Sequence, residues 1–142
     1  MDSWTLIQHM QRFHRRVQAR LQPAMGRLGL NPSTAFLLAA VERYPHPSDL
    51  AQELSLPAPT VSRLLKDLEA AGYLTRQTVP EDLRRFRLAL TPQGEAIRKA
   101  AKEELSVAVE AMLRRLAPED RETLDRLMAA LTEQEEAEAD GR

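Results

Sequence analysis

The chain has 142 residues, 43% of them hydrophobic and 29% charged, which suits a soluble globular domain, or a small domain whose remaining elements pack on a second copy. It contains no cysteine, which excludes disulfides, thiolate metal sites and a cysteine nucleophile. The net charge of −1 provides no overall attraction to polyanions, and no apolar run approaches the ~18 residues that a membrane helix needs. Because the N-terminal segment also lacks the apolar core of a signal peptide, we expect a cytoplasmic protein without membrane contact.

The first predicted element is a long amphipathic helix. Apolar side chains recur at steps of three and four over residues 4–28, and Asp2 or Ser3 can cap the helix. Pro23 falls inside this pattern, so we expect a kink or a restart just before it. The arginines within residues 12–20 are interpreted as a solvated helix face, with contact to phosphates or to an anionic effector as the alternatives.

Two short helices follow. The second helix is predicted to begin with Asn31 as its N-cap and Pro32 at the first helical position, and to end before Pro45. A third helix is predicted over about residues 47–54, with His46 in the cap position. A tight turn then leads to the next helix.

The fourth predicted helix, residues 58–71, has two different faces. Apolar residues at i, i+3, i+4 and i+7 form one stripe that is expected to be buried, while polar residues lie elsewhere on the helix. Gly72 occupies the position that follows a helix end. The apolar stripe consists of Val61, Leu64, Leu65 and Leu68.

Beyond this glycine the pattern changes from helical to alternating. Residues 73–79 and 86–91 predict two β-strands, and the polar segment 80–85 is expected to connect them as a hairpin.

The C-terminal part predicts two more helices with long apolar stripes. The first begins at Thr91 and Pro92, and Ala117 and Pro118 separate it from the second. The acidic segment 133–142 is interpreted as a frayed tail. These stripes, together with that of the first helix, present more apolar surface than one small lobe can cover, so they must pack on one another, on a partner, or on both.

A short helix, a tight turn, a second helix and a β-hairpin follow one another in the order of a winged helix-turn-helix. We therefore predict a mainly α fold with a small β-hairpin wing (α+β). In this fold residues 31–91 form the winged helix-turn-helix lobe, and residues 1–30 and 92–142 supply flanking helices within one compact chain. A major groove about 12 Å wide admits one α-helix, and an arginine at a hairpin tip can enter the adjacent minor groove.

The sequence of this lobe resembles the DNA-binding lobe of MarR-type transcriptional regulators. The family's Leu-Ala-x-x-Leu helix, Asp-x-Arg wing and Leu-Thr-x-x-Gly exit all occur, in order and at fitting spacings, within residues 47–94. In this chain they are Leu50, Ala51 and Leu54, then Asp82 and Arg84, then Leu90, Thr91 and Gly94.

The resemblance implies a homodimer whose flanking helices associate and place two recognition helices in successive major grooves. Such a dimer binds a palindromic operator in double-stranded DNA, in most cases as a repressor. It is often released from DNA by a small aromatic or anionic effector bound between the dimer helices and the lobe. No cofactor is implied.

The resemblance also assigns candidate DNA contacts. Arg84 is similar to the wing arginine that enters the minor groove, Asp82 to the carboxylate that holds it in position, and Arg85 is a further candidate beside them. The family reads bases or adjacent phosphates at the positions that are held here by Pro59, Thr60, Ser62 and Arg63. Lys66 is a candidate for a phosphate contact.

Two positions depart from the family's pattern. Pro57 replaces a capping Ser or Thr, and Leu83 replaces an arginine that the wing often carries.

The sequence does not support several other functions. His9 and His14 are five residues apart, so they do not share a helical face as zinc ligands, and no metal site is expected. No catalytic motif is present, so no enzyme is expected. The competing hypothesis is a winged-helix module that binds a protein instead of DNA.

Overall fold

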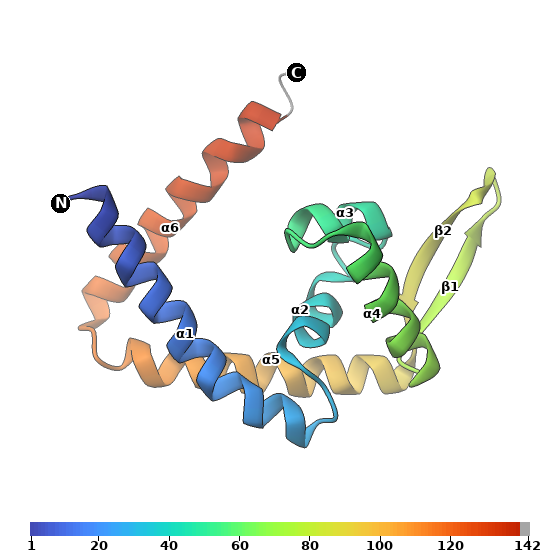
Figure 1. The fold of residues 1–142 in the computed structure, drawn as a ribbon, viewed down its shortest axis with the longest axis horizontal. Coiled ribbons are helices and arrows are strands. Elements are labelled where there is room, and N and C mark those ends of the chain that lie inside the picture. Colours follow the sequence, from blue (N-terminus) through green and yellow to red (C-terminus); the bar gives the residue numbers. More distant parts are fainter. Residues whose placement is uncertain (140–142) are drawn as a thin grey trace. The chain divides into compact units, whose positions relative to one another are not determined.

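The computed structural model describes residues 1–139, with all their side chains except those of residues 79, 82–85 and 133–139. The chain divides into two compact units, residues 1–106 and 107–142. The predicted mainly α fold with an antiparallel β-hairpin is confirmed. In the described part of the chain, no helix is both long and apolar enough to cross a membrane. The elements in chain order are α1 (Ser3–Arg27), α2 (Pro32–Ala40), α3 (Pro47–Glu53), α4 (Ala58–Ala70), β1 (Leu74–Val79), β2 (Asp82–Leu90), α5 (Pro92–Leu113) and α6 (Pro118–Ala139) (Figure 1).

Helix α1 begins as predicted but continues further than its proline suggested. The Asp2 side chain accepts a hydrogen bond from the Trp4 backbone N–H at 3.2 Å and caps the helix. The expected restart before Pro23 is wrong, because α1 runs through this residue to Arg27. Proline removes one backbone hydrogen bond, and the residues around it compensate because they are buried. These buried residues are Val17, Leu21, Ala24 and Met25.

A reciprocal pair of hydrogen bonds fixes the start of α2. The Asn31 side chain accepts from the Thr34 backbone N–H at 3.0 Å, and the Thr34 hydroxyl accepts from the Asn31 N–H at 3.0 Å. This capping box satisfies two N–H donors that a helix start would otherwise leave free. The predicted cap at Asn31 is confirmed.

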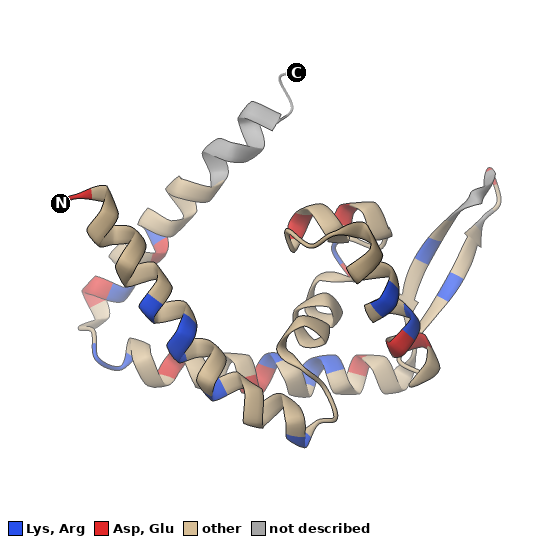
Figure 2. Ribbon diagram, viewed as in Figure 1, with Lys and Arg blue, Asp and Glu red and all other residues tan. Residues whose placement is uncertain are grey.

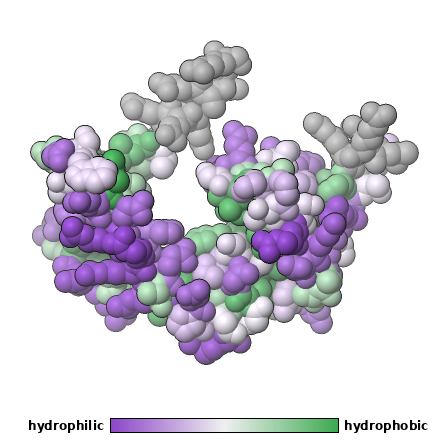
Figure 3. All heavy atoms as spheres, viewed as in Figure 1, coloured by the Kyte–Doolittle hydropathy of each residue, from purple (hydrophilic) through white to green (hydrophobic). Residues whose placement is uncertain are grey.

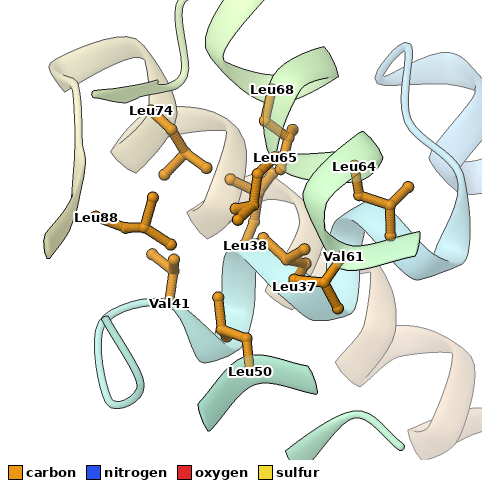
Figure 4. Packing of buried hydrophobic residues seen from close by; sticks show 10 residues of the cluster. All are labelled: Leu37, Leu38, Val41, Leu50, Val61, Leu64, Leu65, Leu68, Leu74 and Leu88. Carbon is orange, nitrogen blue, oxygen red and sulfur yellow. The ribbon is translucent and has the colours of Figure 1, made fainter. Parts of the chain in front are cut away.

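The core of the lobe forms where α2, α3, α4 and both strands meet (Figure 4). The stripe predicted for α4 is fully buried there, so this prediction is confirmed. Each such side chain contributes about 1.5–3 kcal/mol of hydrophobic free energy, which holds α4 with its opposite face outward. The core residues are Leu37, Leu38, Val41, Leu50, Val61, Leu64, Leu65, Leu68, Leu74 and Leu88.

A second, smaller cluster joins α1 to α2 and α5 within the first unit. It consists of Ala24, Met25, Ala35 and Ala101, all of them buried. Small side chains let helix backbones approach closely, so these residues attach the N-terminal helix to the lobe.

The β-hairpin is longer than predicted. Only residues 80 and 81 lie between the strands, and the expectation that residues 82–85 belong to the loop is wrong, because β2 begins at Asp82. The register is regular from Leu74–Leu90 to Thr78–Phe86 and then shifts, so that Val79 pairs with Asp82. Near its tip a two-stranded ribbon has no core to cover, and the alternating pattern that identifies a strand is therefore absent.

The turn after α4 and the start of α5 are bonded to each other. Gly72 has a φ of +80°, which favours glycine, and its carbonyl accepts a hydrogen bond from the Thr91 hydroxyl at 2.6 Å. The same Thr91 oxygen accepts from the Gly94 N–H at 3.0 Å and so caps α5, while the Thr91 N–H donates to the Tyr73 carbonyl at 3.1 Å. A side chain at Gly94 would place its Cβ 2.0 Å from the Tyr73 carbonyl oxygen. The Leu-Thr-x-x-Gly exit is thus a close contact between two backbone segments.

The second unit contains the last turns of α5 and helix α6. The predicted break at Ala117 and Pro118 is confirmed, because α6 begins at Pro118. The Arg121 guanidinium spans the break, since it lies 3.0 Å from the Glu110 carboxylate and donates to the Leu116 carbonyl at 3.4 Å. Of the segment predicted to fray, residues 133–139 belong to α6, and residues 140–142 lie outside the described residues.

Candidate nucleic-acid interface

The outward face of α4 carries most of the predicted recognition residues. Pro59, Arg63 and Lys66 recur at steps of four and three residues on the side opposite the buried stripe, and all three are exposed. Ser62 is also exposed, on the flank of this face. Basic residues occur on α4 and on both strands (Figure 2). The core packing of α4 therefore presents a polar and basic ridge to the solvent.

The start of α4 lacks a side-chain cap, as the proline before it predicted. Pro57 has a φ of −60° and a ψ of 142°, and no side-chain hydrogen bond caps the helix. Its carbonyl accepts from the Thr60 and Val61 N–H groups at 3.0 and 3.1 Å. A cap side chain accepts from the second or third residue of the helix, and here Pro59 has no N–H while the Thr60 N–H is bonded to Pro57, so the missing cap leaves neither N–H free.

Thr60 differs from its neighbours because it is half-buried and lines a surface pocket of about 310 Å³. Helices α1 and α2 form the other walls of this pocket, together with Arg63, Leu64 and Asp67 of α4. Phe36 supplies an aromatic wall and is 37% exposed. The contributions of α1 and of the start of α2 are Gln18, Gln22, Asn31, Pro32 and Ser33.

The wing residues are placed by the backbone alone. All three residues lie in β2: Asp82 pairs with Val79, and Arg84 and Arg85 lie within the register shift that separates this pair from Thr78–Phe86. Their side chains lie outside the described residues, so the ion pair expected between Asp82 and Arg84 stays a prediction. The roles of the α4 residues in DNA binding likewise stay predictions.

An ion-pair cluster attaches α5 to the segment after α2. The Arg98 side chain is only 13% exposed and lies 3.3 Å from the Glu42 carboxylate while also pairing with Glu95. The hydrogen bond from Arg98 lowers the pKa of the Glu95 carboxyl, and the same bond raises the pKa of the Arg98 guanidinium. This cluster lies beside the wing exit and helps to hold α5 against the lobe.

The basic residues of α1 face the solvent. Four arginines of this helix are exposed, and this part of α1 is hydrophilic in the space-filling view (Figure 3). Among the described residues, no group of three histidine or acidic side chains lies close enough to hold a metal ion. The four arginines are Arg12, Arg15, Arg16 and Arg20.

The sequence did not identify two features beside the interface. One is the pocket, which depends on how α1 approaches α4 and has no motif of its own. The other is Arg76, which pairs with Glu69 of α4 and lies over the Phe86 ring. A signal for Arg76 existed, because the alternating pattern puts it on the same side of β1 as the buried Leu74, where an apolar residue is expected.

Together, α3, α4 and the hairpin define a winged helix-turn-helix protein. Residues 28–85 match the model of the MarR family, which is the family that the motifs of this lobe resemble. The chain is 32% identical over 84 residues to the HTH-type transcriptional regulator YdgJ of Bacillus subtilis, covering 59% of this chain and 51% of YdgJ. It thus spans about half the length of that relative.

Solved structures share the fold across most of the chain. A mutant of MarR from Escherichia coli, complexed with operator DNA, superposes with a TM-score of 0.77 at 19% identity, covering 90% of this chain and 94% of MarR. The MarR family protein Rv2887 of Mycobacterium tuberculosis, in complex with salicylic acid, has a TM-score of 0.73 at 23% identity, covering 86% of this chain and 92% of Rv2887. At these identities the likeness concerns the fold.

Proposed function

We propose that this protein is a DNA-binding transcriptional regulator that represses its target genes by binding a palindromic operator as a homodimer. The observation that carries the proposal is the outward face of α4, where Pro59, Arg63 and Lys66 are exposed on a helix whose other face is locked in the core. An exposed helix with this composition fits a major groove, where arginine reads guanine and lysine contacts phosphate. The match to the MarR family supports this function.

Dimerisation is supported by exposed apolar side chains on α1 and on α6. On α1, Trp4, Ile7, Met10 and Phe13 are 47–63% exposed. On α6, Leu124, Leu127, Met128 and Leu131 are 40–65% exposed. Monomeric proteins rarely expose such stripes, and a twofold dimer covers them with the least additional structure. Its two α4 helices would contact half-sites about 10 base pairs, or roughly 34 Å, apart.

The pocket beside α4 supports the further proposal that a small aromatic acid regulates DNA binding. An aromatic ring fits against Phe36, and a carboxylate fits the Arg63 guanidinium at the opposite wall. Asp67 lies on the same side of α4 and would repel the carboxylate of the ligand, so this group is expected at the Arg63 end of the pocket. A ligand held there withdraws Arg63 and Thr60 from DNA. The salicylic acid complex of Rv2887 supports an effector of this class.

Selection of duplexes from a random pool by the purified protein tests the operator. We expect enrichment of a palindrome and a steep loss of affinity with rising salt, because each phosphate contact releases counterions. Arg63→Ala is expected to weaken operator binding and to relax the preference at one base pair. Arg115→Ala removes the same charge from an exposed position outside the lobe and serves as the control. A protein that shows no preference over random duplex at moderate salt is not an operator-binding regulator, and the protein-binding alternative then takes its place.

Calorimetric titration with salicylate tests the pocket. Ser33→Val and Phe36→Ala change its walls without altering α4, and both are expected to weaken salicylate binding. If both variants bind salicylate as the wild type does, the pocket is not the effector site.

A further inference from the structure

One side chain connects the recognition helix to both strands of the wing. Arg76 of β1 forms an ion pair with Glu69 near the end of α4, and its guanidinium lies 4.4 Å from the centre of the Phe86 ring on β2. Arg76 pairs with Leu88 in the register, so Phe86 is its diagonal neighbour on the same face of the ribbon. The side chains of Arg76 and Glu69 are 35% and 27% exposed, which leaves the contact only partly open to solvent.

Phe86 is held from a second direction as well. Its carbonyl oxygen lies 3.3 Å from Nδ1 of His46, the residue that precedes α3. In addition, the Leu88 N–H donates to the Pro45 carbonyl at 2.8 Å. The ring of Phe86 is therefore fixed through α4, and its backbone is fixed through the segment before α3.

The position of Phe86 in the hairpin gives these contacts a consequence for the wing. The pair Thr78–Phe86 is the last one before the register shifts, and residues 83–85 of β2 follow directly. The candidate DNA contacts Arg84 and Arg85 thus begin one residue beyond the point at which the strand is held. Any rotation of the ribbon about Phe86 would move these arginines relative to α4.

We infer that Arg76 is a positioning residue for DNA binding: the contact between Glu69, Arg76 and Phe86, here termed the wing brace, sets the wing relative to α4. The inference rests on the proposed function, because it requires that α4 and the wing bind one DNA duplex together. A wing that is held in its docked orientation before binding loses less conformational entropy on binding. A partly exposed ion pair contributes little to the free energy of unfolding, so the wing brace acts mainly on binding.

The variant Glu69→Gln distinguishes this role from a direct contact of Arg76 with phosphate. If Arg76 bound DNA itself, removal of its carboxylate partner would free the guanidinium, remove a negative charge and strengthen binding. The wing brace predicts weaker binding instead, by about 2- to 12-fold, which is the range expected for one side chain that must be immobilised on association. Arg76→Met, which keeps apolar cover over Phe86 but loses the charge, is expected to weaken binding to a similar degree. Glu53→Gln removes an equal charge from an exposed position on α3 and is the control.

A double-mutant cycle with Arg84→Ala completes the test, with the selected operator duplex as the probe and salt held constant. We expect Glu69→Gln to have a smaller effect once Arg84 is replaced, because the wing brace acts through the wing arginines. Thermal melting points of Glu69→Gln and Arg76→Met should stay close to that of the wild type. Tighter binding by Glu69→Gln, or losses that add fully to that of Arg84→Ala, would overturn the inference and leave operator binding intact. A wild-type protein without operator preference would overturn the proposed function and the wing brace together.

Discussion

Replacement of Gly94 by alanine probes the contact on which the wing exit depends. The added Cβ would lie 2.0 Å from the Tyr73 carbonyl oxygen and 2.8 Å from its carbon, both backbone atoms that cannot rotate away. Real Cβ atoms essentially never approach another atom within 3.0 Å, so the two segments must separate by at least about 1 Å. Thr91 bonds these segments together, and its hydrogen bonds would be stretched by this separation.

The cost follows from how far the separation weakens this contact. Thr91 forms hydrogen bonds with Gly72, Tyr73 and Gly94, and each contributes about 0.5–1.5 kcal/mol, of which stretching removes only a part. Overpacking of a close contact costs about 1–3 kcal/mol, while alanine in place of glycine within a helix returns about 0.5–1 kcal/mol. We therefore expect Gly94→Ala to lower the free energy of unfolding by about 1–3 kcal/mol, which corresponds to a melting temperature lower by roughly 3–10 °C.

Thermal or urea unfolding measures this effect, with the protein concentration held constant because a dimer's stability depends on it. Gly26→Ala is the matched control, since this residue lies in α1 and a Cβ there would meet no atom within 4 Å. The control is expected to be neutral or to stabilise the protein by up to about 1 kcal/mol. If Gly94→Ala unfolds at the same temperature as Gly26→Ala, the close approach of Tyr73 to α5 is not present in solution.

Three more outcomes are expected. In competition assays with mutated operators, Arg63→Ala should weaken operator binding by about 1–3 kcal/mol and relax specificity at one base pair. Lys66→Ala should weaken binding to all sequences equally and reduce the dependence of log affinity on log salt by about one. Equal effects of the two variants would refute the assignment of Arg63 to a base and of Lys66 to a phosphate. Because the folded-state pKa of Glu95 is lowered, its stabilising contribution is present above the unfolded pKa and is lost as the pH falls through the folded pKa. Glu95→Gln should therefore be less stable than the wild type near neutral pH and match it in acid, and a constant difference in urea midpoints would contradict this. The Leu127 side chain is 50% exposed, and Leu127→Glu should shift the protein from dimer to monomer in sedimentation velocity while its helical circular dichroism persists. An unchanged dimer would exclude this part of α6 from the interface.

The long helix α1 shows how far a periodic pattern can be interpreted. The sequence contains one continuous apolar stripe, and the helix that it predicted is present. The structure divides that stripe, since Ile7 and Met10 are 47% and 57% exposed while Leu21 and Met25 are fully buried. Periodicity specifies that a face is apolar and not what covers it, so the burial of the second half against α2 and α5 could not be predicted.

Some features of the candidate site could likewise be predicted from the sequence, and others could not. The two faces of α4 follow from the spacing of its own residues, and the caps at Asp2 and Asn31 from side chains next to the helices that they begin. These features are local, and a sequence determines them because each depends on residues within one or two helical turns. The requirement for Gly94 and the contact of Arg76 with Phe86 join positions 10 or more residues apart, as does the pocket between α1 and α4.

By itself, then, the sequence determined the order of the elements, the family that the lobe resembles and the side of α4 that faces outward. The tertiary structure decided how long the hairpin is, which half of α1 is covered and what holds the wing against α4. The physical reason is that helix and strand periods depend on neighbouring residues, whereas close packing and ion pairs depend on where distant backbone segments come together.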